Sequence, residues 1–177
     1  QGLREEALGR MAPAMAETYR AEEAAGRAPV FLENCERAVL ARLRSMEEAD
    51  FAALDQGREG LYRRLYGAGR AAVSVEALLA AAKTKRYPYA RLRRMVLWAY
   101  LGLRPEEFPE AVPYLRVLAA NETGRTLLAR MRKTASVPIL TKPAAANRLG
   151  KAARELFALE ARAAALYALA YPDLSAA

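Results

Sequence analysis

The chain has 177 residues, of which 54% are hydrophobic and 27% charged, and its formal net charge is +8. This composition excludes a disordered or fibrous chain and predicts one globular domain that buries about 70% of its extended surface. The sequence has no histidine and one cysteine, which excludes Ser-His and Cys-His catalytic pairs, His-based zinc sites and intramolecular disulfides. Alanine, leucine and arginine dominate, so we expect a mainly α fold.

The sequence shows no secretion signal and no membrane span. Its longest charge-free run near the end, residues 163–172, is far shorter than the roughly 18 apolar residues that a transmembrane helix requires. A single cysteine also fits a reducing compartment, so we expect a cytoplasmic protein without a membrane partner. Because the chain starts at Gln1, inside a predicted helix, we expect it to be part of a longer protein.

Charge is distributed unevenly along the chain. Residues 58–94 contain 10 basic and 2 acidic residues, and residues 116–154 contain 9 and 1, so each segment carries +8. Two basic segments in an otherwise acidic chain indicate a local anionic partner. By charge, we divide the single domain into an acidic helical part (1–57), a basic part (58–154) and a C-terminal helix (155–177).

Helices are predicted over most of the first hundred residues. The first full helix begins at Pro13 and ends before Gly26, since proline suits a first turn and glycine a helix end. The next covers 30–46. Its apolar positions recur every four residues, at Phe31, Cys35, Val39 and Leu43. Cys35 should therefore face a core and serve packing, not nucleophilic catalysis.

Four further helices are expected before residue 104. They cover residues 47–54, 58–69, 74–85 and 88–103. Ser74 can cap the third of them. In the fourth, apolar residues share one face, at Leu92, Val96 and Ala99. Arg91, Arg94 and Trp98 lie on another face of that helix.

The pattern changes after residue 112. An extended run (113–121), a helix capped by Asn121 and a second extended run (136–142) indicate a small two-stranded parallel β element with one crossover helix. Pro138 restricts the second strand to an edge. A long helix over 150–170 ends the chain. The predicted fold is a helical domain with a strand-helix-strand element near residues 113–142.

The segment KTKRYPYARLRRM, residues 83–95, holds six positive charges and no acid. Its cations fall at the end of one helix and the start of the next, where a phosphate backbone could lie, and Tyr87, Tyr89 or Trp98 could stack on an exposed base. Cations also gather at helix ends to complement the helix dipole, and tyrosines beside turns are commonly packing residues. Charge alone leaves both interpretations open, and the interleaved aromatics favour RNA over duplex DNA.

Five ordered motifs resemble one known family. They are EGLYRRL (59–65), KTKRYPYARLRRM (83–95), PYLRVLAANETG (113–124), SVPILTK (136–142) and LEARAAALY (159–167). In this order and at about this spacing they resemble the C-terminal half of the bacterial tRNA(Met) cytidine acetate ligases, a nucleotidyltransferase-like family. The resemblance covers nearly the whole chain.

The resemblance implies a role in tRNA modification. Members of the family acetylate the wobble cytidine of elongator tRNA(Met) with acetate and ATP, the latter implied here with Mg²⁺, through an acetyl-adenylate. Their N-terminal nucleotidyltransferase-like catalytic domain, with its HxGH-type signature, is expected to be absent from this chain. The chain itself would then bind tRNA, hold no cofactor and not be catalytic. The alternative is an interaction domain that docks the catalytic half or a second subunit without touching RNA.

Ten residues are candidates for RNA binding, and none is assigned to catalysis or metal binding. They are Lys83, Lys85, Arg86, Tyr87, Tyr89, Arg91, Arg94, Arg64, Arg116 and Lys142. Arg64 and Arg116 lie in otherwise apolar motifs, so an internal ion-pairing or hydrogen-bonding role that fixes the fold is equally open for each. Pro88 stands where the family commonly has threonine, which removes any hydroxyl role there. Glu160 stands where relatives often have aspartate.

Overall fold

The computed structural model describes residues 2–55 and 60–177. It divides the chain into two compact units, Gln1–Pro105 with Ala164–Ala177, and Glu106–Ala163. We refer to these as unit 1 and unit 2. The unit boundaries differ from the charge boundaries at residues 58 and 154, because packing and not charge decides which segments associate.

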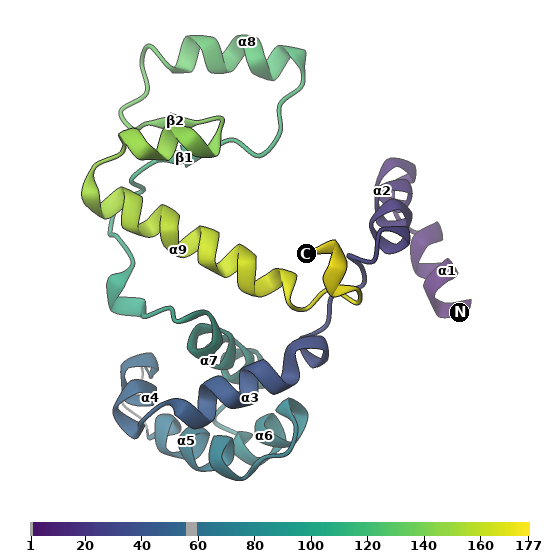
Figure 1. Cartoon of the computed structure of the whole chain (residues 1–177), viewed down its shortest axis with the longest axis vertical. Coiled ribbons are helices and arrows are strands. Elements are labelled where there is room, and N and C mark those ends of the chain that lie inside the picture. Colours follow the sequence, from purple (N-terminus) through teal and green to yellow (C-terminus); the bar gives the residue numbers. More distant parts are fainter. Residues whose placement is uncertain (1, 56–59) are drawn as a thin grey trace. The chain divides into compact units, whose positions relative to one another are not determined.

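Unit 1 is helical in its described residues (Figure 1). Its helices are α1 (Gly2–Gly9), α2 (Pro13–Ala24), α3 (Glu36–Ser45), α4 (Glu48–Leu54), α5 (Leu61–Ala71), α6 (Val75–Ala82) and α7 (Tyr89–Leu101), with the 3-10 turns η1 (Leu32–Cys35) and η4 (Leu174–Ala176). Local chemistry sets several of their ends. Pro13 occupies the first position of α2, and the Ser74 hydroxyl caps α6 by accepting the Ala77 N–H at 3.0 Å. Gly102, in the left-handed conformation, ends α7.

The core of unit 1 lies among α3, α5, α6 and α7, which pack against one another (Figure 1). Its most deeply buried side chains are Leu43, Leu61, Leu65, Leu78, Leu79, Leu92, Val39 and Val96. Cys35 is buried in this core, as the four-residue spacing predicted. Phe31 is 56% exposed, because the segment before Glu36 is a 3-10 turn and not part of the α-helix expected over 30–46.

The structure places the basic turn differently from the sequence-based expectation. The helix expected over 74–85 ends at Ala82, and the helix expected from Pro88 starts at Tyr89. Residues 83–88 therefore form a connection between α6 and α7. Pro88, with φ −71° and ψ 151°, is the residue before the first helical position. The expected start of α5 at residue 58 lies outside the described residues.

Unit 2 contains the parallel β element. Strands β1 (Leu115–Arg116) and β2 (Ile139–Leu140) pair in parallel, Leu115 opposite Ile139, and α8 (Glu122–Met131) connects them. The Leu115 N–H donates to the Pro138 carbonyl at 2.8 Å. Pro138 thus takes part in the pairing through its carbonyl, which a proline can do although it has no N–H. The expected fold class, mainly α with one small parallel pair, is confirmed, although the strands are two residues long.

The remaining elements of unit 2 cover this pair. They are the 3-10 turns η2 (Pro105–Glu107), which begins in unit 1, and η3 (Pro143–Arg148), and most of helix α9 (Lys151–Ala168). A small core forms from Tyr114, Leu140, Ala146 and Leu149, against which Leu156 and Phe157 of α9 pack. Asn121 caps α8, as expected, by accepting the Gly124 N–H at 2.8 Å.

Three hydrogen bonds hold the C-terminal segment on unit 1. The Asp173 N–H donates to the Gly26 carbonyl at 3.0 Å. The Asn34 side-chain amide donates to the Ala170 carbonyl at 2.7 Å, and the Tyr100 hydroxyl donates to the Leu166 carbonyl at 3.3 Å. The last residues of the chain, from Ala164 on, thus belong to the same unit as the first part of the chain up to Pro105.

The described residues contain neither a membrane-spanning helix nor a cluster of metal ligands. None of the helices there is long and apolar enough to cross a membrane. In the same part of the chain, no three His, Cys, Asp or Glu side chains gather where they could hold a metal ion.

Candidate nucleic-acid interface

The turn between α6 and α7 is built around a threonine. The Thr84 hydroxyl oxygen accepts the backbone N–H groups of Arg86 and Tyr87, each at 3.2 Å. The Lys83 ammonium donates to the Thr84 carbonyl at 2.7 Å. A hydroxyl that binds N–H groups two and three residues ahead fixes a turn locally. The turn therefore presents the exposed side chains of Lys85 and Arg86 in one defined loop.

The first turns of α7 interleave aromatic rings with cations. The half-buried Tyr89 ring lies between Lys83, whose ammonium is 5.7 Å from the ring centroid, and Arg93, whose guanidinium carbon is 5.8 Å away. The Arg94 guanidinium is 5.3 Å from the Trp98 ring. Each contact is worth about 0.5–1 kcal/mol at an exposed site. We define the α7 surface as Lys83, Lys85, Arg86, Tyr89, Arg93, Arg94 and Trp98.

Arg64 binds the end of α6. Its guanidinium donates to the carbonyl oxygens of Ala81 at 3.2 Å and of Ala82 at 3.4 Å. These carbonyls belong to the last turn of the helix, which has no further N–H groups of its own to satisfy them. Arg64 is exposed, but its contacts make it first a helix-capping residue.

Two of the ten candidate residues point inward. Arg91 forms an ion pair with Asp55 at 3.0 Å, and the Asp55 side chain is 0% exposed while that of Arg91 is 25% exposed. The other Asp55 oxygen accepts the Tyr62 N–H at 3.3 Å. Tyr87 is 5% exposed and packs in the unit 1 core, with the Arg91 guanidinium 5.6 Å from its ring. Its ring is therefore not available to stack on a base.

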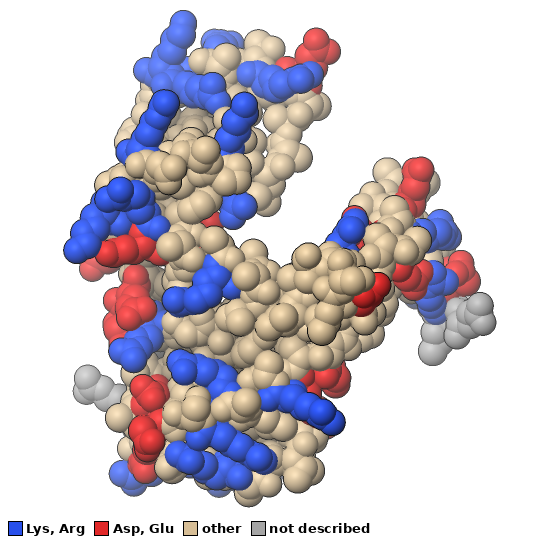
Figure 2. All heavy atoms as spheres, viewed as in Figure 1, with Lys and Arg blue, Asp and Glu red and all other residues tan. Residues whose placement is uncertain are grey.

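The remaining two candidates, Arg116 and Lys142, lie in unit 2 and not with the other eight. Arg116 forms an ion pair with Glu160 at 3.2 Å, and the Tyr114 hydroxyl donates to the other Glu160 oxygen at 2.8 Å. Burial, followed by the hydrogen bond to Glu160, raises the pKa of Tyr114 to about 12. Lys142 is exposed at the start of η3. Figure 2 shows Lys and Arg side chains gathered over α8 and the neighbouring strands.

Sequence reasoning missed two contributors to the α7 surface. Arg93 was not among the ten candidates, although Tyr89 and Arg93 are four residues apart and therefore neighbours on one helix face. Thr84 was not recognised as the residue that fixes the turn. A weak signal was present, because a threonine hydroxyl in a helix-helix connection can bond backbone N–H groups ahead of it in an ST-turn.

The exposure of the cationic side chains distinguishes a surface that could contact RNA from cations that only stabilise the fold. The side chains of Lys85 and Arg86 are exposed, and that of Lys83 is partly buried. Glu76, one acid considered as a partner for them, is itself exposed. Glu59, the other, lies outside the described residues. Of the three cations, Lys85 and Arg86 thus lie at the surface of unit 1.

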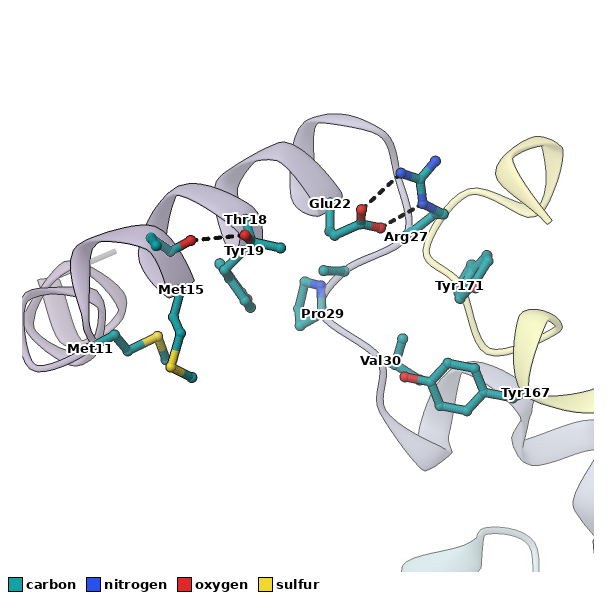
Figure 3. A pocket seen from close by; sticks show the side chains of 12 residues that line it. Met11, Met15, Thr18, Tyr19, Glu22, Arg27, Pro29, Val30, Tyr167 and Tyr171 are labelled. Carbon is teal, nitrogen blue, oxygen red and sulfur yellow. Dashed lines mark hydrogen bonds and ion pairs between the residues drawn. The ribbon is translucent and has the colours of Figure 1, made fainter. Parts of the chain in front are cut away.

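A separate groove in unit 1 contains none of the ten candidates (Figure 3). Its volume is about 790 Å³, and its lining includes Met11, Met15, Tyr19, Val30 and Tyr167. Figure 3 shows the Glu22–Arg27 ion pair, 2.6 Å between the closest atoms, at the same groove. Met15 and Tyr167 are more than half exposed, so the groove presents apolar surface to its surroundings.

The chain belongs to the HIGH Nucleotidyl Transferase family, whose model matches residues 2–177.

The chain is similar in sequence to tRNA(Met) cytidine acetate ligases. The tRNA(Met) cytidine acetate ligase of Kosmotoga olearia is 32% identical over 162 residues, which cover 82% of this chain and 38% of the relative. The ligase of the same name from Thermosipho melanesiensis is 34% identical over 122 residues, covering 67% of this chain and 29% of the relative. The chain thus spans well under half of their length.

Solved structures give the same relationship. The crystal structure of Thermotoga maritima TmcAL bound with alpha-thio ATP matches 98% of this chain and 46% of its own, with a TM-score of 0.88 and 26% identity. An apo form of that protein matches 90% of this chain and 41% of its own, with a TM-score of 0.83 and 28% identity.

Proposed function

We propose that this chain is a tRNA-contacting C-terminal domain of a cytoplasmic ligase that uses acetate and ATP to acetylate the wobble cytidine of elongator tRNA(Met). The observation that carries the proposal is the α7 surface, on which exposed cations alternate with Tyr89 and Trp98. The names of the relatives support the substrate and the reaction. The TmcAL complex with alpha-thio ATP supports the nucleotide.

The chemistry of the α7 surface suits RNA for two reasons. Cations displace counterions from phosphates, which gives affinity without reading sequence. Aromatic faces stack on unpaired bases at about 1–3 kcal/mol per base. Because Arg93 and Arg94 each stand beside a ring, a strand crossing α7 would meet a phosphate partner and a stacking partner within one turn of helix.

Catalysis and nucleotide binding are not assigned to residues of this chain. The chain has no histidine, and the described residues offer no cluster of metal-binding side chains.

The first test is tRNA binding by the 177-residue chain. Lys85→Glu and Arg93→Glu should each weaken binding of a tRNA(Met) transcript about tenfold at low salt. Each should also reduce the slope of log K against log salt by about one, because one phosphate contact is lost. Arg37→Glu is the matched control, since Arg37 is an exposed cation of unit 1 on α3, outside the α7 surface.

The control decides what a loss of affinity means. Equal losses in Lys85→Glu and Arg37→Glu would show attraction to overall charge alone and would contradict a defined interface. The same substitutions in a protein that also contains the catalytic portion should raise the KM for tRNA while acetate-dependent ATP turnover continues.

A second function, docking of the catalytic portion of the ligase, is favoured by the groove in Figure 3. The relatives are more than twice as long as this chain, so a further part of such a protein is available to cover apolar side chains such as Met15. Met15→Glu in the longer protein should then impair adenylate formation and leave tRNA affinity unchanged. Unchanged adenylate formation would contradict docking at this groove.

A further inference from the structure

A small hollow in unit 2 lies where both parallel strands end. Its volume is about 140 Å³. It is lined by Arg116, Val117, Leu118, Leu140, Thr141, Lys142, Pro143 and Phe157. Arg116 is the last residue of β1, and Thr141 and Lys142 directly follow β2. The parallel register brings these ends together, and ligands of parallel sheets commonly bind at the carboxyl ends of strands.

The polar groups at this hollow are hydrogen-bond donors. Arg116 and Lys142 supply two cations to its lining. Arg132 adds a third nearby, because its guanidinium donates to the Thr141 hydroxyl oxygen at 2.8 Å. Since that oxygen accepts from Arg132, the Thr141 hydroxyl hydrogen remains a donor. Among the described residues that line the hollow, none is acidic.

One acid, Glu160, contacts a residue of the lining, Arg116. Glu160 accepts the Tyr114 hydroxyl at 2.8 Å and the Arg116 guanidinium at 3.2 Å. Only one terminal nitrogen of Arg116 takes part in this ion pair, and Phe157 supports the face of the guanidinium, whose central carbon is 5.5 Å from the ring. A guanidinium held on one side by a carboxylate and a ring is pre-organised to present its other donors.

Size and charge together define the ligand. A hollow of about 140 Å³ is well below the roughly 300–1,000 Å³ of sites that enclose whole small molecules, so it accommodates a group and not a nucleoside. Guanidinium, ammonium and hydroxyl donors without a lining acid fit a tetrahedral oxyanion.

We propose that this hollow binds a single phosphate group through Arg116, Thr141 and Lys142, with Arg132 at its edge. Where that phosphate belongs to an RNA backbone, the site deepens the proposed function and rests on it. Where it belongs to a nucleotide, the site stands without it. Both sources present the same oxyanion to the same donors.

The test is a titration of the ¹⁵N-labelled 177-residue chain with inorganic phosphate, followed by the amide signals of Arg116, Thr141 and Lys142. Saturable shifts confined to this region are expected in the wild type. Lys142→Ala should weaken phosphate binding about tenfold, because one charge-assisted hydrogen bond is lost. Lys133→Ala, which removes an equally exposed cation of unit 2 outside the hollow, is the control and should leave the binding constant unchanged.

Two further titrations identify the source. If a tRNA(Met) transcript shifts the same signals and Lys142→Ala weakens it, the phosphate is that of RNA. If ATP does so and tRNA does not, the phosphate is that of a nucleotide, and the site is supported while its link to RNA is overturned. Absence of saturable phosphate shifts, or equal losses in Lys142→Ala and Lys133→Ala, would overturn the site. None of these outcomes depends on the α7 surface, whose failure is measured by Lys85→Glu and Arg93→Glu.

Discussion

Arg91 and Arg94, three residues apart on α7, do different work. Arg91 pairs with the buried carboxylate of Asp55, whereas Arg94 lies over Trp98 at the surface. Removing one partner of a buried pair costs about 3–5 kcal/mol, and less where one partner is partly exposed. Arg91→Ala should therefore lower the free energy of unfolding by about 3 kcal/mol, seen as a lower urea midpoint.

Arg94→Ala is the matched comparison. It should change the free energy of unfolding by less than about 0.5 kcal/mol and still weaken tRNA binding. If Arg94→Ala destabilised the chain as much as Arg91→Ala, the guanidinium of Arg94 would be a structural group, and the α7 surface would lose one of its cations.

Tyr114 makes the stability of unit 2 depend on alkaline pH. Burial and the hydrogen bond to Glu160 raise its pKa to about 12, from the ordinary tyrosine value of 10.0. The folded state therefore keeps the proton more tightly than the unfolded state does. This contribution is fully present below pH 10 and is lost as the pH rises toward 12.

The measurement compares unfolding of the wild type with that of Tyr114→Phe between pH 8 and about 12. The wild type should lose stability relative to Tyr114→Phe over the upper part of this range. Tyr167→Phe, which removes an exposed hydroxyl, should follow the wild type. Parallel pH profiles for wild type and Tyr114→Phe would contradict this coupling.

Helix α6 is short and is stabilised by side chains at both of its ends. It has eight residues, Ser74 caps its first turn, and Arg64 binds its last carbonyls. Short helices gain little from their own hydrogen bonds. Ser74→Ala should therefore cost about 1 kcal/mol and speed hydrogen exchange of the first amides of α6.

Ser45→Ala provides the control for that substitution. The Ser45 hydroxyl donates to the Arg42 carbonyl within its own helix, and its loss leaves no N–H group without its acceptor. Unchanged exchange in α6 of Ser74→Ala would show that packing of its buried leucines alone sets the start of the helix.

Local chemistry made most elements predictable from the sequence. Pro13 sets the start of α2 through its fixed φ, and Ser74 and Asn121 cap α6 and α8 by accepting N–H groups three positions ahead. The predicted starts agree with the structure. The strand-helix-strand pattern was likewise legible, but the strands were expected over 113–121 and 136–142. They are shorter because only Leu115 with Ile139 and Arg116 with Leu140 form pairs, so each strand has two residues.

The candidate site was less predictable. Which of its residues are exposed and which point inward depends on contacts between residues far apart in the sequence. Asp55 and Arg91 are 36 positions apart, and Arg116 and Glu160 are 44 apart. No periodicity indicates which arginine meets which acid. The sequence located the basic segment, and only the structure separated the inward Arg91 and Tyr87 from the exposed Lys85 and Arg86.

Gly26 connects the N-terminal part of the chain to the C-terminal segment, because its carbonyl accepts the Asp173 N–H. Its φ is +75°, and a Cβ placed there would lie 2.6 Å from the Asp173 Cβ. Gly26→Ala therefore has both an unfavourable backbone and a collision, and should cost about 2 kcal/mol or more. Hydrogen exchange at Asp173 should accelerate with it.

Gly9→Ala is the control, because it tests whether any glycine-to-alanine substitution near the N-terminus lowers the stability. A Cβ there meets no atom within 4 Å, so its stability should stay within about 0.5 kcal/mol of the wild type. If Gly26→Ala behaved like Gly9→Ala, the hydrogen bond from Asp173 would not be what holds the last residues on unit 1.

The two basic regions should contribute to tRNA binding independently. Lys85 belongs to unit 1 and Lys142 to unit 2, and only Lys142 lines the hollow. The losses from Lys85→Glu and Lys142→Ala should then add in the double variant to within about 0.5 kcal/mol, measured by tRNA titration. A double variant no weaker than Lys85→Glu would show that RNA does not use Lys142.

The position of Trp98 has a practical consequence. It is the single tryptophan of the chain, and it stands on α7 beside Arg94, within the surface proposed to meet RNA. Excitation at wavelengths beyond the tyrosine absorption band selects this tryptophan, so its intrinsic emission reports on that surface without a label. Quenching by a stacked base, or its absence, would read out the encounter directly in solution.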